Sequence, residues 1–127
     1  MRCAVRGSSP AVLVVEDEPL IRLNAVDMVE AAGFQAIGAS TADEALHVLE
    51  LRDDIRAVFT DVHMPGSMDG LALIHLIAGR WPSIAALVTS GKVDLAPADL
   101  PRGARFFAKP WRPMQIEAAL RQLICRS

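Results

Sequence analysis

Short apolar runs alternate with stretches of helical apolar spacing along the chain, and this alternation constrains the fold more than any other feature. The apolar runs predict five β-strands, at residues 11–15, 34–39, 55–60, 84–89 and 104–108. The helical stretches predict helices at residues 19–32, 42–49, 68–78 and 113–124. Strands that alternate with helices form a parallel sheet with helices packed on both faces. The predicted fold class is therefore a doubly wound α/β fold.

Residues that favour helix ends stand at the borders of these stretches. Pro19 suits the first turn of the first helix, and Gly33 suits the position just after its end. Ser40 or Thr41 is expected to cap the second helix. Pro82 follows the third helix closely and would prevent it from continuing.

The length of 127 residues suits one compact domain, predicted at residues 11–127 after an N-terminal extension at 1–10. A hydrophobic share of 52% is enough for a sizeable core, and a net charge of −2 argues against direct DNA binding. No apolar run approaches the ~20 residues that span a membrane, and residues 1–10 do not form a signal peptide. Cys3 and Cys125 show no metal or redox spacing, which favours reduced thiols in a cytoplasm.

Four of the predicted strands end in polar residues that can do chemistry: Glu16 and Asp17, Asp61, Ser90, and Lys109. In a parallel sheet these ends meet at one edge, which is where open α/β sheets bind ligands. Carboxylates crowded there would repel one another unless a cation lies among them, and hard oxygen donors suit Mg²⁺ or Mn²⁺. A lysine and a hydroxyl beside such a metal can donate to a phosphoryl group, and a carboxylate can itself be the nucleophile.

Each of these residues also has an ordinary structural interpretation. An acid at a strand end is commonly a turn or helix-capping residue, which would account for Glu16, Asp17 and Asp61 one at a time. Lys109, just before a proline, would commonly be a solvated surface side chain. The chemical interpretation is favoured because all of these residues are predicted to lie at the same sheet edge.

Four stretches, in this order, resemble the receiver domain of two-component response regulators, and the resemblance runs from residue 12 to about residue 123. They are Val14-Val15-Glu16-Asp17-Glu18-Pro19, Thr60-Asp61-Val62-His63-Met64-Pro65 with Met68-Asp69-Gly70, Thr89-Ser90-Gly91, and Phe106-Phe107-Ala108-Lys109-Pro110. The resemblance implies a flavodoxin-like (βα)5 three-layer sandwich. Its five parallel strands would follow the order 2-1-3-4-5.

The resemblance also implies a metal site for Mg²⁺ or Mn²⁺. Asp17 matches a direct metal ligand, and Glu16 would act directly or through water. Asp61 matches the phospho-acceptor, which also contacts the metal. The backbone carbonyl of His63 matches the position that supplies a further protein oxygen.

The phosphoryl group and the switch are assigned by the same resemblance. Lys109 matches the lysine that contacts the phosphoryl group, and Ser90 matches the hydroxyl that bonds to it and switches. Phe106 matches the aromatic switch position, whereas Phe107 is expected to be an ordinary strand aromatic. Thr89 is an alternative for the hydroxyl, but strand alternation would point it into a face of the sheet.

Two residues near the site keep two interpretations each. His63 lies two residues after Asp61, and Lys92 lies two residues after Ser90. Either residue would tune hydrolysis of the phosphate, or it would be a loop residue without such a role.

The sequence departs from the family pattern in two places. Gly66 and Ser67 lengthen the loop after the third strand by one residue compared with the commonest form. The segment between the fourth and fifth strands is shorter than usual and contains Pro97 and Pro101. The fourth helix of the family is therefore expected to be short, irregular or missing.

The resulting expectation is a stand-alone cytoplasmic receiver that takes a phosphoryl group from a sensor histidine kinase or a histidine phosphotransfer protein. Its output would pass to a downstream protein target, and its catalysis would be confined to its own aspartate. A pseudo-receiver that keeps the fold without phosphorylation is one alternative. A flavin carrier or small doubly wound enzyme is another, which an aromatic content of 5% and the absence of Tyr and GxGxxG disfavour.

Overall fold

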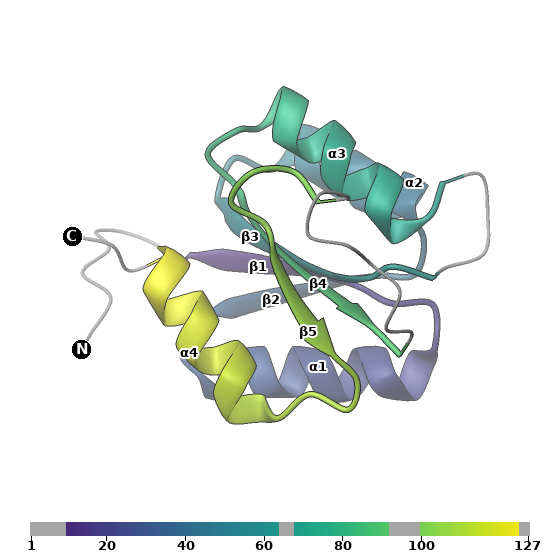
Figure 1. The fold of residues 1–127 in the computed structure, drawn as a ribbon. Coiled ribbons are helices and arrows are strands. Elements are labelled where there is room, and N and C mark those ends of the chain that lie inside the picture. Colours follow the sequence, from purple (N-terminus) through teal and green to yellow (C-terminus); the bar gives the residue numbers. More distant parts are fainter. Residues whose placement is uncertain (1–9, 64–67, 92–99, 125–127) are drawn as a thin grey trace.

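The computed structural model describes residues 10–63, 68–91 and 100–124, and five parallel strands form its single sheet in the order β2-β1-β3-β4-β5 (Figure 1). The strands are β1 (Ala11–Val15), β2 (Gln35–Ala39), β3 (Ile55–Asp61), β4 (Ala85–Ser90) and β5 (Arg105–Ala108). The helices are α1 (Pro19–Ala31), α2 (Ala42–Leu51), α3 (Gly70–Arg80) and α4 (Pro113–Ile124). The predicted doubly wound fold and strand order are confirmed.

Helices cover both faces of the sheet, with α2 and α3 on one side and α1 and α4 on the other (Figure 1). Residues of β1 alternate between the two cores: Leu13 and Val15 pack on the α2–α3 side, and Val12 and Val14 on the α1–α4 side. Every residue of β1 is at most 1% exposed. A parallel strand with both faces covered must be apolar throughout, which explains the Val-rich sequence of this strand.

The ends of α1 and α2 follow the predicted signals. Thr41 rather than Ser40 is the N-cap of α2, because its hydroxyl accepts a hydrogen bond from the Glu44 N–H at 3.1 Å. The Glu44 carboxylate in turn accepts from the Ser40 N–H at 3.0 Å. Gly33, directly after the C-cap of α1, has a φ of +100°, a conformation that glycine adopts without strain.

Boundaries differ from the prediction near the polar strand ends. β3 extends through Asp61 and β4 extends through Ser90, so both side chains project from strands rather than from loops. The third helix was expected to start at Met68, and this was wrong, because α3 begins at Gly70. Asp69 is its N-cap, and the Asp69 carboxylate accepts from the Ala72 N–H at 2.9 Å.

The expected short or irregular fourth helix falls largely on residues 92–99, which lie outside the described residues. Residues 100–104, which are described, form a turn rather than a helix, and the Ala104 N–H donates to the Pro101 carbonyl at 3.1 Å. The N-terminal residues 1–9 and the lengthened loop at 64–67 also lie outside the described part of the chain.

Candidate functional site

The carboxyl ends of β1, β3, β4 and β5 bring the predicted side chains to one edge of the sheet. Glu16 directly follows β1, and Lys109 directly follows β5. Asp61 and Ser90 are the last residues of the two neighbouring strands between them. The central strand β3 therefore presents Asp61 with potential partners on both sides.

Lys109 lies close to the two buried acids of this edge, Asp61 and Glu16. Its Nζ lies 2.7 Å from Oδ2 of Asp61 and 3.8 Å from Oε1 of Glu16. Asp61 is 8% exposed and Glu16 is 5% exposed, so water screens these charges less than it screens a surface ion pair. The Lys109 N–H also donates to the Ser90 carbonyl at 3.0 Å, which positions the start of the lysine side chain.

The second carboxylate oxygen of Asp61 has a different partner. Oδ1 accepts a hydrogen bond from the backbone N–H of His63 at 3.3 Å, so the loop after β3 curls back onto the carboxylate. The Val62 N–H donates to the Thr89 carbonyl at 2.9 Å and continues the ladder between β3 and β4 past Asp61. The backbone next to Asp61 is therefore hydrogen-bonded to β4, and the Asp61 side chain projects from this fixed backbone.

Burial raises the pKa of the Glu16 carboxyl above its ordinary value of 4.5, and a hydrogen bond with the Asp17 side chain and the negative charge of Asp61 add to this rise. The Glu18 N–H, which donates to Oε2 of Glu16 at 3.1 Å, opposes it, and so does the positive charge of Lys109. Two acids thus share a poorly solvated position in which a further cation would stabilise their charged forms.

The donor set fits a magnesium ion. Magnesium is usually held by one or two carboxylates, with waters and phosphate oxygens completing its shell, and Glu16, Asp61 and the exposed Asp17 supply carboxylates at this edge. Within the residues that the structure describes, no group of three or more His, Cys, Asp or Glu side chains lies close enough together to hold a metal ion by itself. A magnesium ion at this edge would therefore take most of its ligands from water and phosphate oxygens.

Gly70 is a site residue whose role the sequence did not reveal. A Cβ at this position would stand 1.8 Å from the carbonyl oxygen of Asp61, and the Gly70 N–H donates to the Val62 carbonyl at 2.9 Å. The start of α3 therefore lies directly against the backbone that carries the aspartate. The available signal was a glycine immediately after the capping Asp69.

Trp111, two positions after Lys109, also lies beside the site, as its place in the sequence suggested. Its ring meets Phe59 edge to face, with centroids 5.3 Å apart and planes at 71°. The same tryptophan lines a cavity of about 10 Å³ beside Asp61, and Thr89 also lines it. Thr89 pairs with Asp61 in register and points toward the α1–α4 face, as strand alternation predicts. It was also expected to point away from the site, and this was wrong, because Thr89 lines the cavity that Asp61 lines.

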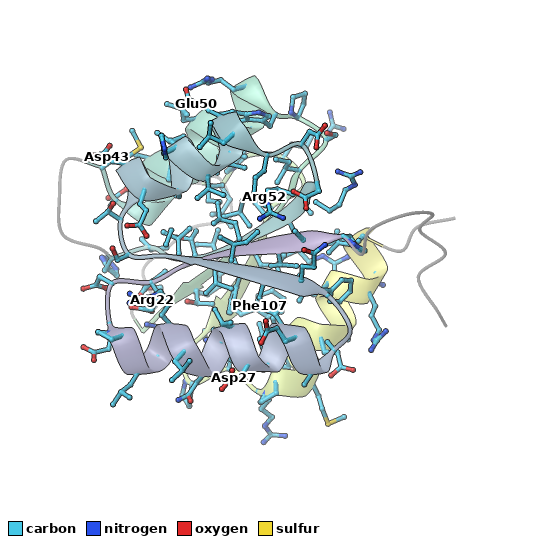
Figure 2. All side chains as sticks on the ribbon, turned by 180° about the vertical axis from the view of Figure 1, so that it is seen from behind. Arg22, Asp27, Asp43, Glu50, Arg52 and Phe107 are labelled. Carbon is cyan, nitrogen blue, oxygen red and sulfur yellow. The ribbon has the colours of Figure 1, made fainter. Side chains whose placement is uncertain are left out.

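The two phenylalanines of β5 face opposite sides of the sheet. Phe107 packs with the core of α1 and α4, and Figure 2 shows it between the sheet and α1. It is therefore the ordinary strand aromatic that was predicted. Phe106 pairs with Val88 and shares the other face with Ser90, which pairs with Ala108. Phe106 is half-buried, and Ser90 is 2% exposed.

A family model described as the response regulator receiver domain matches residues 12–121. The chain belongs to the receiver family of response regulators. Relatives of this receiver include sensor kinase CckA of Brucella abortus, which is 32% identical over 93% of this chain and 13% of that protein. Response regulator protein FleR of Pseudomonas aeruginosa is 36% identical over 79% of this chain and 21% of that protein. The receiver thus spans about a fifth or less of these two relatives.

Solved receiver structures superpose closely on this receiver. The receiver domain protein from Clostridium thermocellum has a TM-score of 0.83 at 26% identity, covering 91% of this chain and 94% of that chain. The receiver domain of the hybrid histidine kinase CckA has a TM-score of 0.76 at 27% identity, covering 90% and 98%. TrrA of Thermotoga maritima, solved in complex with Mg²⁺ and BeF, shares the fold with a TM-score of 0.77 at 21% identity, covering 90% and 98%.

No helix in the described residues is both long enough and apolar enough to cross a membrane.

Proposed function

We propose that this receiver accepts a phosphoryl group on Asp61, from the phosphohistidine of a sensor kinase or of a histidine phosphotransfer protein. The observation that carries the proposal is the 2.7 Å contact between Lys109 Nζ and Asp61 Oδ2 at the carboxyl edge of the sheet, with Glu16 alongside. A buried carboxylate that faces a lysine, with a second acid beside it, is equipped to receive a phosphoryl group together with a divalent cation.

In the proposed reaction a carboxylate oxygen of Asp61 attacks phosphorus, and the P–N bond to the donor imidazole breaks, with its electron pair remaining on nitrogen. Lys109 then donates to a phosphoryl oxygen in place of its present contact with Asp61. Glu16, Asp17, Asp61 and the His63 carbonyl are the groups that would hold Mg²⁺, or Mn²⁺, which supplies charge neutralisation. Catalysis by this chain consists of positioning and electrostatics on its own aspartate, with no separate substrate turned over.

The proposed switch uses Ser90 and Phe106, which share one sheet face. A phosphoryl group on Asp61 would attract the Ser90 hydroxyl, because Lys109 holds the group at the edge of the sheet. The space vacated behind Ser90 would let Phe106 turn inward, which is a packing change biased by one charge-assisted bond. His63 and Lys92 remain candidates for tuning how long the phosphate lasts.

We also propose a stand-alone cytoplasmic role in which a downstream protein receives the signal without direct DNA binding. The net charge of −2 supports the last point. Retention on duplex DNA that weakens as salt rises would contradict it. Immunoblotting of the native protein against a size standard of 13.7 kDa tests the stand-alone role, since a much larger band would contradict it.

The central experiment is incubation of the purified receiver with acetyl phosphate and Mg²⁺, followed by intact-mass measurement. One added phosphoryl group is expected, labile to base as an acyl phosphate is, and absent from Asp61→Asn. Equal uptake by Asp61→Asn would show that another residue is the acceptor. A wild-type protein that takes up no phosphoryl group from acetyl phosphate or from a panel of phosphorylated kinases would instead be a pseudo-receiver.

A further inference from the structure

Arg22 of α1 reaches back to the acidic end of β1. Its Nη1 donates a hydrogen bond to the backbone carbonyl of Glu16 at 2.8 Å. Figure 2 shows Arg22 between α1 and the sheet, and the side chain is half-buried. Arg22 therefore holds the backbone carbonyl between two acids, Glu16 and Asp17. This role differs from that of an ion-pair partner, which would bond a carboxylate.

Glu16 has further contacts that hold its backbone and its side chain, including a side-chain hydrogen bond with Asp17. The Glu16 N–H donates to the Ala39 carbonyl at 3.0 Å, and the carboxylate accepts from the Glu18 N–H at 3.1 Å. Lys109 lies 3.8 Å from the other carboxylate oxygen. The peptide that joins Glu16 to Asp17 is therefore fixed at its oxygen by Arg22, and the direction in which Asp17 leaves the sheet depends on that oxygen.

Gly38 of β2 provides the space through which Arg22 passes. A Cβ at Gly38 would lie 3.2 Å from Cδ and 3.4 Å from Cγ of Arg22. These distances are tighter than ordinary van der Waals contact, and the arginine stem is the partner that can move. A side chain at position 38 would therefore push the stem by a few tenths of an ångström and strain the bond between the guanidinium and the Glu16 carbonyl.

We infer that Arg22 is a positioning residue for the proposed metal site, and that Gly38 is required because it leaves room for the arginine stem. The inference rests on the proposed function, since it assigns these residues a role in presenting Glu16 and Asp17 to Mg²⁺. Charge alone makes the opposite prediction, because a cation near the acids repels Mg²⁺ and its removal would tighten binding. Variants that keep the positive charge separate the two effects.

The test is a Mg²⁺ titration followed by calorimetry and by tryptophan fluorescence, at a temperature where every variant is folded. Trp111 lies beside Asp61, whereas Trp81 lies at the far end of α3. Gly38→Ala and Arg22→Lys keep the charge and are expected to weaken Mg²⁺ binding roughly tenfold, as loss of an outer-shell partner does. Gly79→Ala is the matched control, because a Cβ there meets nothing within 4 Å, and it should bind as wild type does.

A double-mutant cycle decides whether Gly38 acts through Arg22. In an Arg22→Ala background no stem remains to be displaced, so adding Gly38→Ala should change the Mg²⁺ affinity by less than about twofold. The inference is overturned if Gly38→Ala and Arg22→Lys titrate like wild type, or if Gly38→Ala weakens binding equally in both backgrounds. A wild-type receiver without saturable Mg²⁺ binding would instead contradict the proposed function itself.

Discussion

The position of Asp61 depends on its backbone as much as on its side chain. Lys109 and the His63 N–H each bond one carboxylate oxygen, while Gly70 packs against the carbonyl of the same residue. A Cβ at position 70 would stand 1.8 Å from that carbonyl oxygen, which is far inside contact distance. Because the obstacle is backbone, no side-chain rotation can relieve it, and either α3 or β3 must shift when residue 70 is not glycine.

Gly70→Ala is therefore expected to lower the free energy of unfolding by ~2 kcal/mol or more, as overpacking in a close-packed interior does. It should also slow phosphorylation by acetyl phosphate, because Asp61 moves relative to Lys109. Gly79→Ala, on an open part of the same helix, should instead raise stability by ~0.5–1 kcal/mol. Denaturant unfolding measures the stability of the two variants, and reaction with acetyl phosphate measures their phosphorylation rates. A Gly70→Ala protein as stable and as reactive as wild type would contradict the prediction.

Among the connecting elements, the turn between α2 and β3 has a charge pair that makes stability depend on pH. Arg52 and Asp54 form two hydrogen bonds, at 2.9 and 2.6 Å, and the bond to Arg52 lowers the pKa of the Asp54 carboxyl below its ordinary value of 3.8. A carboxyl whose pKa is lowered by folding stabilises the native state above its unfolded pKa. This stabilisation is lost as the pH falls through the folded pKa.

Asp54→Asn should accordingly reduce the free energy of unfolding at pH 7 by less than ~1 kcal/mol, because the pair is partly solvated. The difference from wild type should persist down to about pH 5, begin to fall near the unfolded pKa of ~4, and be lost only below the folded pKa, which lies under 3.8. Urea unfolding between pH 7 and pH 3 measures it, with Asp53→Asn as the neighbouring control. A difference that grows with acidity would show that another interaction dominates.

The pair β4 and β5 is where the proposed switch would act. Phe106 is half-buried and shares a sheet face with Ser90, so a change in the position of Ser90 would alter the surroundings of the Phe106 ring. With 4-fluorophenylalanine at position 106, addition of Mg²⁺ and beryllofluoride should shift the fluorine resonance of wild type. Ser90→Ala should show a smaller shift and Asp61→Asn none. An equal shift in Ser90→Ala would remove the hydroxyl from the mechanism.

Strand ends were predictable because a buried parallel strand is apolar until it reaches the sheet edge, so Asp61 and Lys109 stood out. The contacts of Gly70 and Arg22 were not predictable, since each joins segments whose relative placement depends on helix packing. The start of α3 was misplaced because Met68, which packs against the core, continued the apolar pattern across the capping Asp69.

At the scale of the whole molecule, folding brings acidic side chains together at a position that is poorly exposed to water. Glu16 has a raised pKa because of burial, and Asp61 is nearly as buried. Lys109 compensates part of this charge, but two acids remain for one lysine even before the exposed Asp17 is counted. Folding therefore assembles a site whose repulsion a divalent ion can relieve, and the unfolded chain holds no such cluster.

Binding of Mg²⁺ to the folded chain alone should consequently stabilise the whole receiver. At a free Mg²⁺ concentration ten times the dissociation constant, linkage gives ~1.4 kcal/mol, which corresponds to a rise in melting temperature of roughly 4–7 °C for a domain of this size. The increase should be reduced in Glu16→Gln and reduced further in Asp17→Asn, the proposed direct ligand. Thermal melts with Mg²⁺, against NaCl at equal ionic strength, isolate the specific effect from screening. An equal rise in wild type and Asp17→Asn would mean that the ion binds elsewhere, and an equal rise with NaCl would mean that no specific site contributes.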